Sequence, residues 1–115
     1  TERLHEKAYL NAYTYYKTGK YKSAIVAFKN ALKQYPESKR REEIMYLIVD
    51  SGYRLASNSI SEKQTDRYLS MLDSYLSFKE EFPESKYTKE VDRMAKHARD
   101  YLDRNKKDED KDNNI

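Results

Sequence analysis

The sequence predicts an all-α solenoid of five helices, arranged as two antiparallel hairpins followed by one helix that covers the exposed end. Only two Gly and two Pro occur in 115 residues, so long helices are rarely interrupted. Lys, Arg, Glu, Leu, Ala and Tyr are plentiful, whereas runs of the strand-favouring residues Val, Ile and Thr are absent. A short motif at one helix boundary also returns at a second one, with Pro36 and Pro83 lying 47 residues apart.

The first predicted hairpin covers about residues 4–34. A run without helix breakers ends at Thr18-Gly19-Lys20, and a second run starts at Tyr21 and ends at Tyr35-Pro36. Gly19 permits a left-handed turn residue at little steric cost. The second run places apolar side chains on one face at helical spacing: Ala24, Phe28, Ala31 and Leu32.

The second predicted hairpin covers about residues 40–82. Its first helix is apolar all round from Ile44 to Val49, so we expect it to be covered on more than one side. Gly52 costs this helix about 1 kcal/mol relative to Ala, which indicates a neighbouring helix packed close by. We place the extra length of this unit in longer helices and in the Ser57–Gln64 connection.

The fifth predicted helix covers about residues 86–104 and completes a single repeat domain, residues 1–104. The polar residues 105–115 are predicted to be a disordered tail because they contain almost nothing that a core can bury. The helix carries one apolar stripe: Val91, Met94, Ala95, Ala98 and Leu102.

The internal repeat is the strongest signal in the chain. Tyr35-Pro36-Glu37-Ser38-Lys39 returns as Phe82-Pro83-Glu84-Ser85-Lys86. Each Pro ends a helix because the residue before a proline is disfavoured in the α conformation. Ser38 and Ser85 then offer hydroxyls that we expect to cap the next helix. Repeated helical hairpins indicate a solenoid.

Several classes of function are excluded by composition. The chain has no Cys, and its two histidines, His5 and His97, lie far apart in the sequence. Without a nucleophile motif or a Gly-rich loop, we predict no catalytic, cofactor or metal site. The net charge of +3 comes from 23 basic and 20 acidic residues that are well mixed, so we predict no nucleic-acid partner.

Twelve tyrosines are the most distinctive feature of the composition. We hypothesise that some line a groove for an extended peptide or a partner helix, because Tyr provides contact area at low entropic cost. Helical spacing selects the candidates: Tyr9, Tyr13 and Tyr16 on the first helix, Tyr46 and Tyr53 on the third, with Lys17 and Arg54 beside them.

The alternative is that tyrosine rings pack between neighbouring helices with their hydroxyls outward. We favour packing for the aromatic residues at core-like repeat positions, which are Tyr15, Tyr21, Phe28 and Tyr75. For the three first-helix candidates, both interpretations stay open at this point.

The first hairpin resembles a tetratricopeptide repeat, in which small residues let two helices approach and aromatic residues fill the space between them. The usual period is about 34 residues, so the second unit is longer by about 13. The residues that carry the resemblance are Ala12, Tyr15, Gly19, Tyr21, Ala24, Phe28, Ala31 and Pro36.

Over about residues 4–104 the chain also resembles the C-terminal portion of the BamD family, the lipoproteins of the outer-membrane β-barrel assembly machine of Gram-negative bacteria. The segments that carry this resemblance are YYKTGKYKSAIVAFKNALKQYPESKRREEIMYLI and DSYLSFKEEFPESKY. It implies a scaffold on the periplasmic face of the outer membrane that works with BamA, a protein with POTRA domains and a barrel.

The family's lipidated cysteine and its N-terminal repeats have no counterpart in this sequence. We therefore expect a fragment that contacts the membrane only through a lipid absent from it. Two alternatives remain open: a generic tetratricopeptide-like module that captures peptides in the envelope or the cytoplasm, and a repeat fragment that self-associates through its exposed ends.

Overall fold

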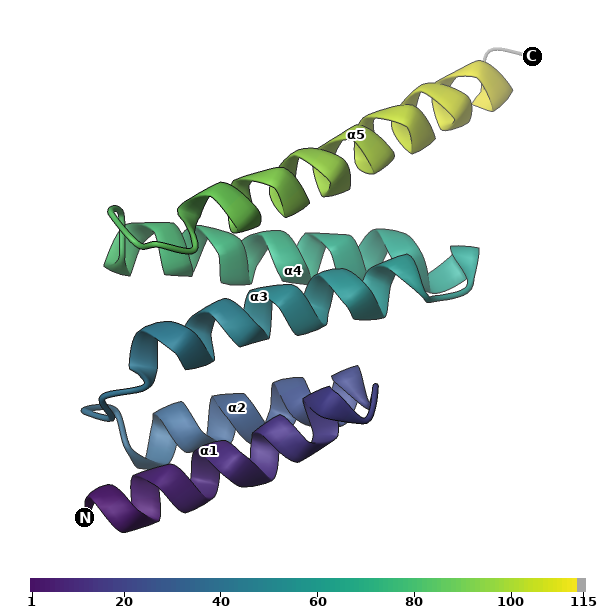
Figure 1. Ribbon diagram of the computed structural model, residues 1–115. Helices are drawn as coiled ribbons and strands as arrows, with labels where there is room; N and C mark the ends of the chain where they lie inside the picture. Colours follow the sequence, from purple (N-terminus) through teal and green to yellow (C-terminus); the bar gives the residue numbers. More distant parts are fainter. Residues whose placement is uncertain (114–115) are drawn as a thin grey trace.

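The computed structural model describes residues 1–113, which form five α-helices and contain no strand (Figure 1). The helices stack beside one another into a thin body with extents of 61 × 29 × 19 Å. The predicted all-α class, with two hairpins and a final helix, is confirmed. The helices are α1 (Glu2–Lys17), α2 (Tyr21–Gln34), α3 (Arg41–Ser57), α4 (Ser61–Glu81) and α5 (Thr88–Asn113).

The turns within the two hairpins are short, and they cover residues 18–20 and 58–60. Gly19 has a φ of +79°, a left-handed conformation that glycine adopts at little cost. The second connection is shorter than the predicted Ser57–Gln64, because α4 already begins at Ser61. The extra length of the second hairpin lies mainly in α4, which has 21 residues against 14 in α2.

The two copies of the repeated motif adopt the same backbone conformation. Tyr35 ends α2 with φ −131° and ψ 69°, and Phe82 ends α4 with φ −128° and ψ 66°. In both copies the motif serine, Ser38 or Ser85, accepts with its hydroxyl the amide two residues further on, at 3.2 and 3.0 Å. Because each following helix starts three residues after the serine, the hydroxyl stabilises the turn and does not cap the helix as predicted.

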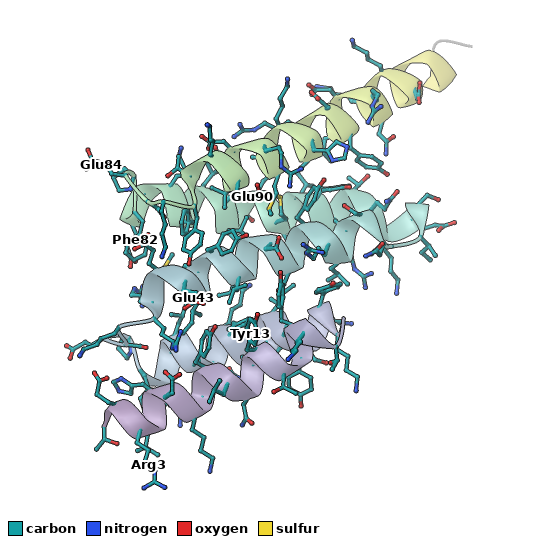
Figure 2. The ribbon with its side chains drawn as sticks, in the orientation of Figure 1. Arg3, Tyr13, Glu43, Phe82, Glu84 and Glu90 are labelled. Carbon is teal, nitrogen blue, oxygen red and sulfur yellow. The ribbon has the colours of Figure 1, made fainter. Side chains whose placement is uncertain are left out.

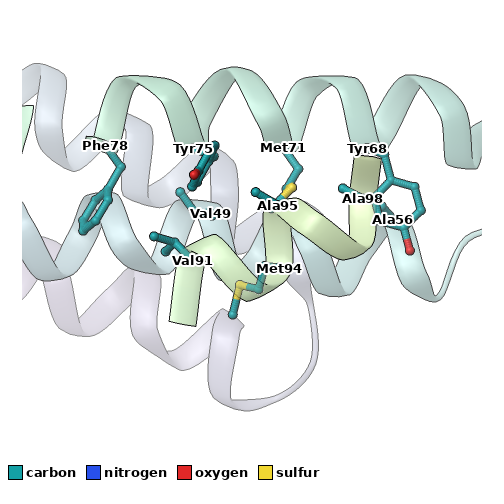
Figure 3. Packing of buried hydrophobic residues seen from close by; sticks show 10 residues of the cluster. All are labelled: Val49, Ala56, Tyr68, Met71, Tyr75, Phe78, Val91, Met94, Ala95 and Ala98. Carbon is teal, nitrogen blue, oxygen red and sulfur yellow. The ribbon is translucent and has the colours of Figure 1, made fainter. Parts of the chain in front are cut away.

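The core is divided between the two sides of α3, which explains why the middle of this helix is apolar all round. One cluster lies among α1, α2 and α3: Tyr9, Ala12, Ala24, Phe28, Ala31, Ile44, Leu47 and Ile48. The other lies among α3, α4 and α5 (Figure 3): Val49, Ala56, Tyr68, Met71, Tyr75, Phe78, Val91, Met94, Ala95 and Ala98.

Gly52 lies at the closest approach of α3 and α4. A Cβ atom at this position would lie 3.3 Å from the Cβ atom of Met71, which is closer than ordinary van der Waals contact. The prediction that a neighbouring helix accounts for this glycine is confirmed. Glycine therefore weakens α3 locally and in return allows α4 to pack tightly.

The predicted end of the ordered chain is wrong, because α5 continues to Asn113 and includes most of the residues 105–115 expected to be disordered. Residues 114–115 lie outside the described residues. Helix formation needs no burial here, since opposite charges four residues apart stabilise an exposed helix. The pairs with this spacing are Asp103 with Lys107, and Arg104 with Asp108.

Candidate functional site

Most of the predicted site residues lie where the first helices of the two hairpins, α1 and α3, meet each other and α5 (Figure 2). Hydrogen bonds join α1 to α3 and α3 to α5 along this side of the molecule. We call it the first-helix face and define it by the seven predicted residues: Tyr9, Tyr13, Tyr16, Lys17, Tyr46, Tyr53 and Arg54.

Tyr9 is part of the core and does not line a groove. Its side chain is only 5% exposed, and its hydroxyl donates to Glu43 at 2.8 Å. The guanidinium of Arg40 lies over the ring, 4.1 Å from its centroid. The groove-lining interpretation is therefore wrong for Tyr9, because α3 covers the ring and satisfies its hydroxyl.

Arg40 ties α1 to the start of α3. Its guanidinium donates to both carboxylate oxygens of Glu6, at 2.7 and 2.8 Å, and to Glu43 at 2.8 Å. A two-pronged arginine–carboxylate contact fixes orientation as well as distance. The hydrogen bonds from Arg40 hold the pKa of Glu6 below its ordinary value.

A second tie joins the end of α1 to the middle of α3. Asp50 is buried, with 1% exposure, and its carboxylate accepts from the Tyr16 hydroxyl at 2.5 Å and from Arg54 at 2.8 Å. Burial raises the pKa of Tyr16 well above its ordinary value of 10.0, and the hydrogen bond to Asp50 adds to this effect. Arg54 thus balances the charge of a buried carboxylate while its own side chain stays half-exposed.

The two third-helix tyrosines contact α5 or the turn just before it. The ring of Tyr46 stacks on that of Tyr87, with centroids 4.1 Å apart and planes 5° apart. The hydroxyl of Tyr53 hydrogen-bonds Nδ1 of His97. Both tyrosines are half-buried.

Of the candidates on α1, Lys17 is exposed, whereas Tyr13 and Tyr16 are half-buried. Tyr13 is half-buried between the rings of Tyr9 and Tyr16, with its centroid 5.6 Å from each (Figure 2). Lys17 is exposed at the end of α1.

The residues for which packing was predicted behave differently from one another. Phe28 and Tyr75 are buried, with 0% and 7% exposure, as predicted. Tyr21 is half-buried beside Tyr16, with ring centroids 5.9 Å apart. The packing prediction is wrong for Tyr15, which is 42% exposed because α1 turns its neighbours Ala12 and Tyr16 toward the core.

The face therefore offers half-buried aromatic rings held by hydrogen bonds or by contacts with other rings, with cationic side chains beside them. Such a surface suits contact with another polypeptide, because the rings are already ordered before binding. Within residues 1–108, whose side chains are described, no group of three or more His, Cys, Asp or Glu is placed to hold a metal ion.

Comparison with known proteins identifies the family. The sequence matches the family YfiO, described as outer membrane lipoprotein, over residues 1–107. The chain belongs to this outer membrane lipoprotein family. The predicted BamD-family resemblance is thereby confirmed, since YfiO is the BamD family. A search of curated proteins found no match. In this family member, none of the described helices combines the length and the apolar character needed to cross a bilayer.

The buried Tyr9 and the half-buried Tyr16 of this family member should make its stability fall at alkaline pH. Burial raises the pKa of Tyr9 and Tyr16 above 10.0 in the folded chain, so the unfolded chain loses these protons first as the pH rises. Because the folded state binds more protons there, the free energy of unfolding should fall as the pH passes 10. Urea unfolding at about pH 8 and about pH 11 measures this loss.

A matched pair of variants assigns the effect. Tyr16→Phe removes the ionisable hydroxyl and should reduce the loss between the two pH values, whereas Tyr15→Phe changes an exposed ring and should leave the loss unchanged. An equal loss in both variants would show that Tyr16 does not cause it.

Proposed function

We propose that the chain is a non-catalytic scaffold of the outer-membrane β-barrel protein assembly complex, acting on the periplasmic face of the outer membrane. The observation that carries this proposal is the family match over residues 1–107, which includes nearly all of the helical stack. The proposed partner is a BamA-like protein, through its POTRA domains.

The proposed contact surface is the first-helix face without its buried member. Its aromatic members Tyr13, Tyr46 and Tyr53 are half-buried. Lys17 adds positive charge, and the half-exposed Arg54 offers a guanidinium that is paired with Asp50. Rings already held in place lose little freedom on binding, which favours affinity. The ties from Arg40 and Asp50 support this role because they keep α1 and α3 in one relative position.

Two substitutions test this surface. Tyr13→Ala and Lys17→Glu should each reduce retention of the BamA-like protein at least about tenfold in a pull-down from envelope extract. The melting temperature should change little, because Lys17 is exposed and Tyr13 is only half-buried. Lys7→Glu, an equal charge change at another exposed position of α1, is the control and should retain the partner normally.

Other outcomes would contradict the proposal in distinct ways. Normal retention by both variants would remove the first-helix face from the interface. A large drop in melting temperature for Tyr13→Ala with unchanged retention would make that ring structural. Binding of short peptides without any assembly partner would favour the generic tetratricopeptide-like module.

A further inference from the structure

A groove separates the second helices of the two hairpins. Figure 1 shows α2 and α4 running in the same direction with α3 between them. The groove consists of two adjoining cavities of about 280 and 60 Å³, which share Lys29 from α2, Ile48 from α3 and Ser74 from α4. It is distinct from the first-helix face, because its walls are the second helices.

The floor of the groove is apolar and straight. It is formed by α3 through Met45, Ile48, Gly52 and Leu55, which stand at positions i, i+3, i+7 and i+10 of the helix. The eleven residues from Met45 to Leu55 span about 15 Å along the helix axis, or nearly three turns. On the α4 wall, Ser74 and Ser77 are small; on the floor, Met45 is half-buried and Ile48 is only 6% exposed. The larger cavity, about 280 Å³, therefore has room for apolar side chains of a partner beside Met45 and Ile48, whereas the smaller one, about 60 Å³, leaves little space.

The shape of the groove selects a helix among the common forms of bound peptide. An added strand needs a sheet edge, and the described residues contain no strand. A proline-rich segment needs an aromatic-lined groove, whereas no aromatic residue lines these two cavities. An amphipathic helix laid into an apolar groove needs neither, and its side chains at i, i+3 and i+7 match the spacing of the floor.

The two walls carry opposite charge beside the larger cavity, whereas at the smaller cavity the α4 wall contributes the basic Arg67. The α2 helix contains no acidic residue, and its exposed Lys29 and Lys33 stand on the α2 side of the groove. Facing them, α4 presents exposed Asp73 and Glu80, seven residues apart and so on one face of the helix. Within the described part of the chain, no ion pair involves any of these four side chains.

We propose that this groove binds an amphipathic helix of a partner protein, with an apolar seam on α3, an acidic flank facing α2 and a basic flank facing α4. The proposal rests on the proposed scaffold function for its biological role and adds a second contact surface to it. The opposite walls also set the direction of the bound helix, because reversing the helix would place each flank against like charge.

Synthetic peptides test the charge pattern. The probe is a fluorescein-labelled helix of about 15 residues with a Leu seam, Glu on one flank and Lys on the other. Two control peptides keep the seam and carry either Glu or Lys on both flanks. The mixed peptide should bind the full chain at least about tenfold more tightly than either control, and the difference should shrink at high salt.

Variants of the chain place the peptide. Ser77→Trp fills the groove and Lys29→Glu inverts the charge of one wall, so each should weaken binding of the mixed peptide at least about tenfold. The controls are Ser23→Trp and Lys22→Glu, which make the same changes at exposed positions of α2 outside the groove, and they should bind as the unmodified chain does. Circular dichroism confirms that all four variants fold.

The proposal fails if Ser77→Trp binds the mixed peptide normally, if the three peptides bind equally, or if no binding saturates below about 1 mM. A failure of the proposed scaffold function can be distinguished from a failure of the groove proposal. The first-helix variants Tyr13→Ala and Lys17→Glu should retain peptide binding whether or not the BamA-like partner is lost.

Discussion

Replacing Phe28 with alanine is expected to lower the free energy of unfolding by about 3–5 kcal/mol. The ring is completely buried and belongs to the cluster that joins the first hairpin to α3. Its neighbours include the ring of Tyr9, with centroids 6.3 Å apart. The hydrogen bonds of Arg40 and Asp50 fix the positions of α1 and α3, so the helices can collapse only partly into the space that the ring leaves. The free-energy cost of the remaining cavity therefore adds to that of the lost apolar burial.

Urea denaturation measures this effect, with Val26→Ala as the matched control on the same helix. Val26 is 57% exposed, so its truncation should change the free energy of unfolding by no more than about 0.5 kcal/mol. An unchanged m value in both variants would show that the same cooperative unit unfolds. A loss below about 1 kcal/mol for Phe28→Ala would contradict its place in the core.

Local signals were enough to predict the helices and the order in which they stack. Pro36 and Pro83 act on the residue before them, and Gly19 acts on its own φ, so these boundaries depend little on distant contacts. The agreement of the two motif copies in backbone angles shows the same independence. Gly52 was informative for a different reason. Glycine destabilises a helix, so its presence within α3 indicated that a neighbouring helix packs close to it.

The ties within the candidate site were missed, although a signal for some of them was present. Three contacts between α1 and α3 join residues exactly one usual repeat length, 34 residues, apart. A search for complementary side chains at that spacing would have found them: Glu6 with Arg40, Tyr9 with Glu43, and Tyr16 with Asp50. Between α3 and the turn before α5 the spacing is 43 residues, and between α3 and α5 it is 44, because the second hairpin is longer.

Periodicity could not decide which tyrosines face the core. Successive side chains of a helix point about 100° apart. A small rotation of α1 about its axis therefore decides whether Tyr15 or Tyr16 is the more exposed. The structure turns Ala12 and Tyr16 inward and leaves Tyr15 outward. The groove between α2 and α4 was equally out of reach, because it depends on how far apart two helices of different hairpins lie.

Replacing Asp50 with alanine is expected to lower the free energy of unfolding by about 1.5–3 kcal/mol, the range for hydrogen bonds to charged groups. The carboxylate is 1% exposed and holds both the Tyr16 hydroxyl and the Arg54 guanidinium. Arg54 is 49% exposed and can return to water, so the loss should stay below that of a fully buried ion pair. The Tyr16 hydroxyl has less access to water, so its loss of the Asp50 partner should account for much of the decrease in the free energy of unfolding.

A double-mutant cycle with Tyr16→Phe separates these contributions, because residues in one hydrogen-bond network show non-additive effects. If the Tyr16–Asp50 bond carries the effect, the double variant should be less destabilised than the sum of the single variants by about 0.5–3 kcal/mol. Tyr15→Phe with Asp50→Ala is the control cycle and should be additive, since Tyr15 is exposed and hydrogen-bonds nothing on α3 within the described residues. Additivity in both cycles would mean that Asp50 acts through Arg54 alone and that the tie from α1 to α3 contributes little to stability.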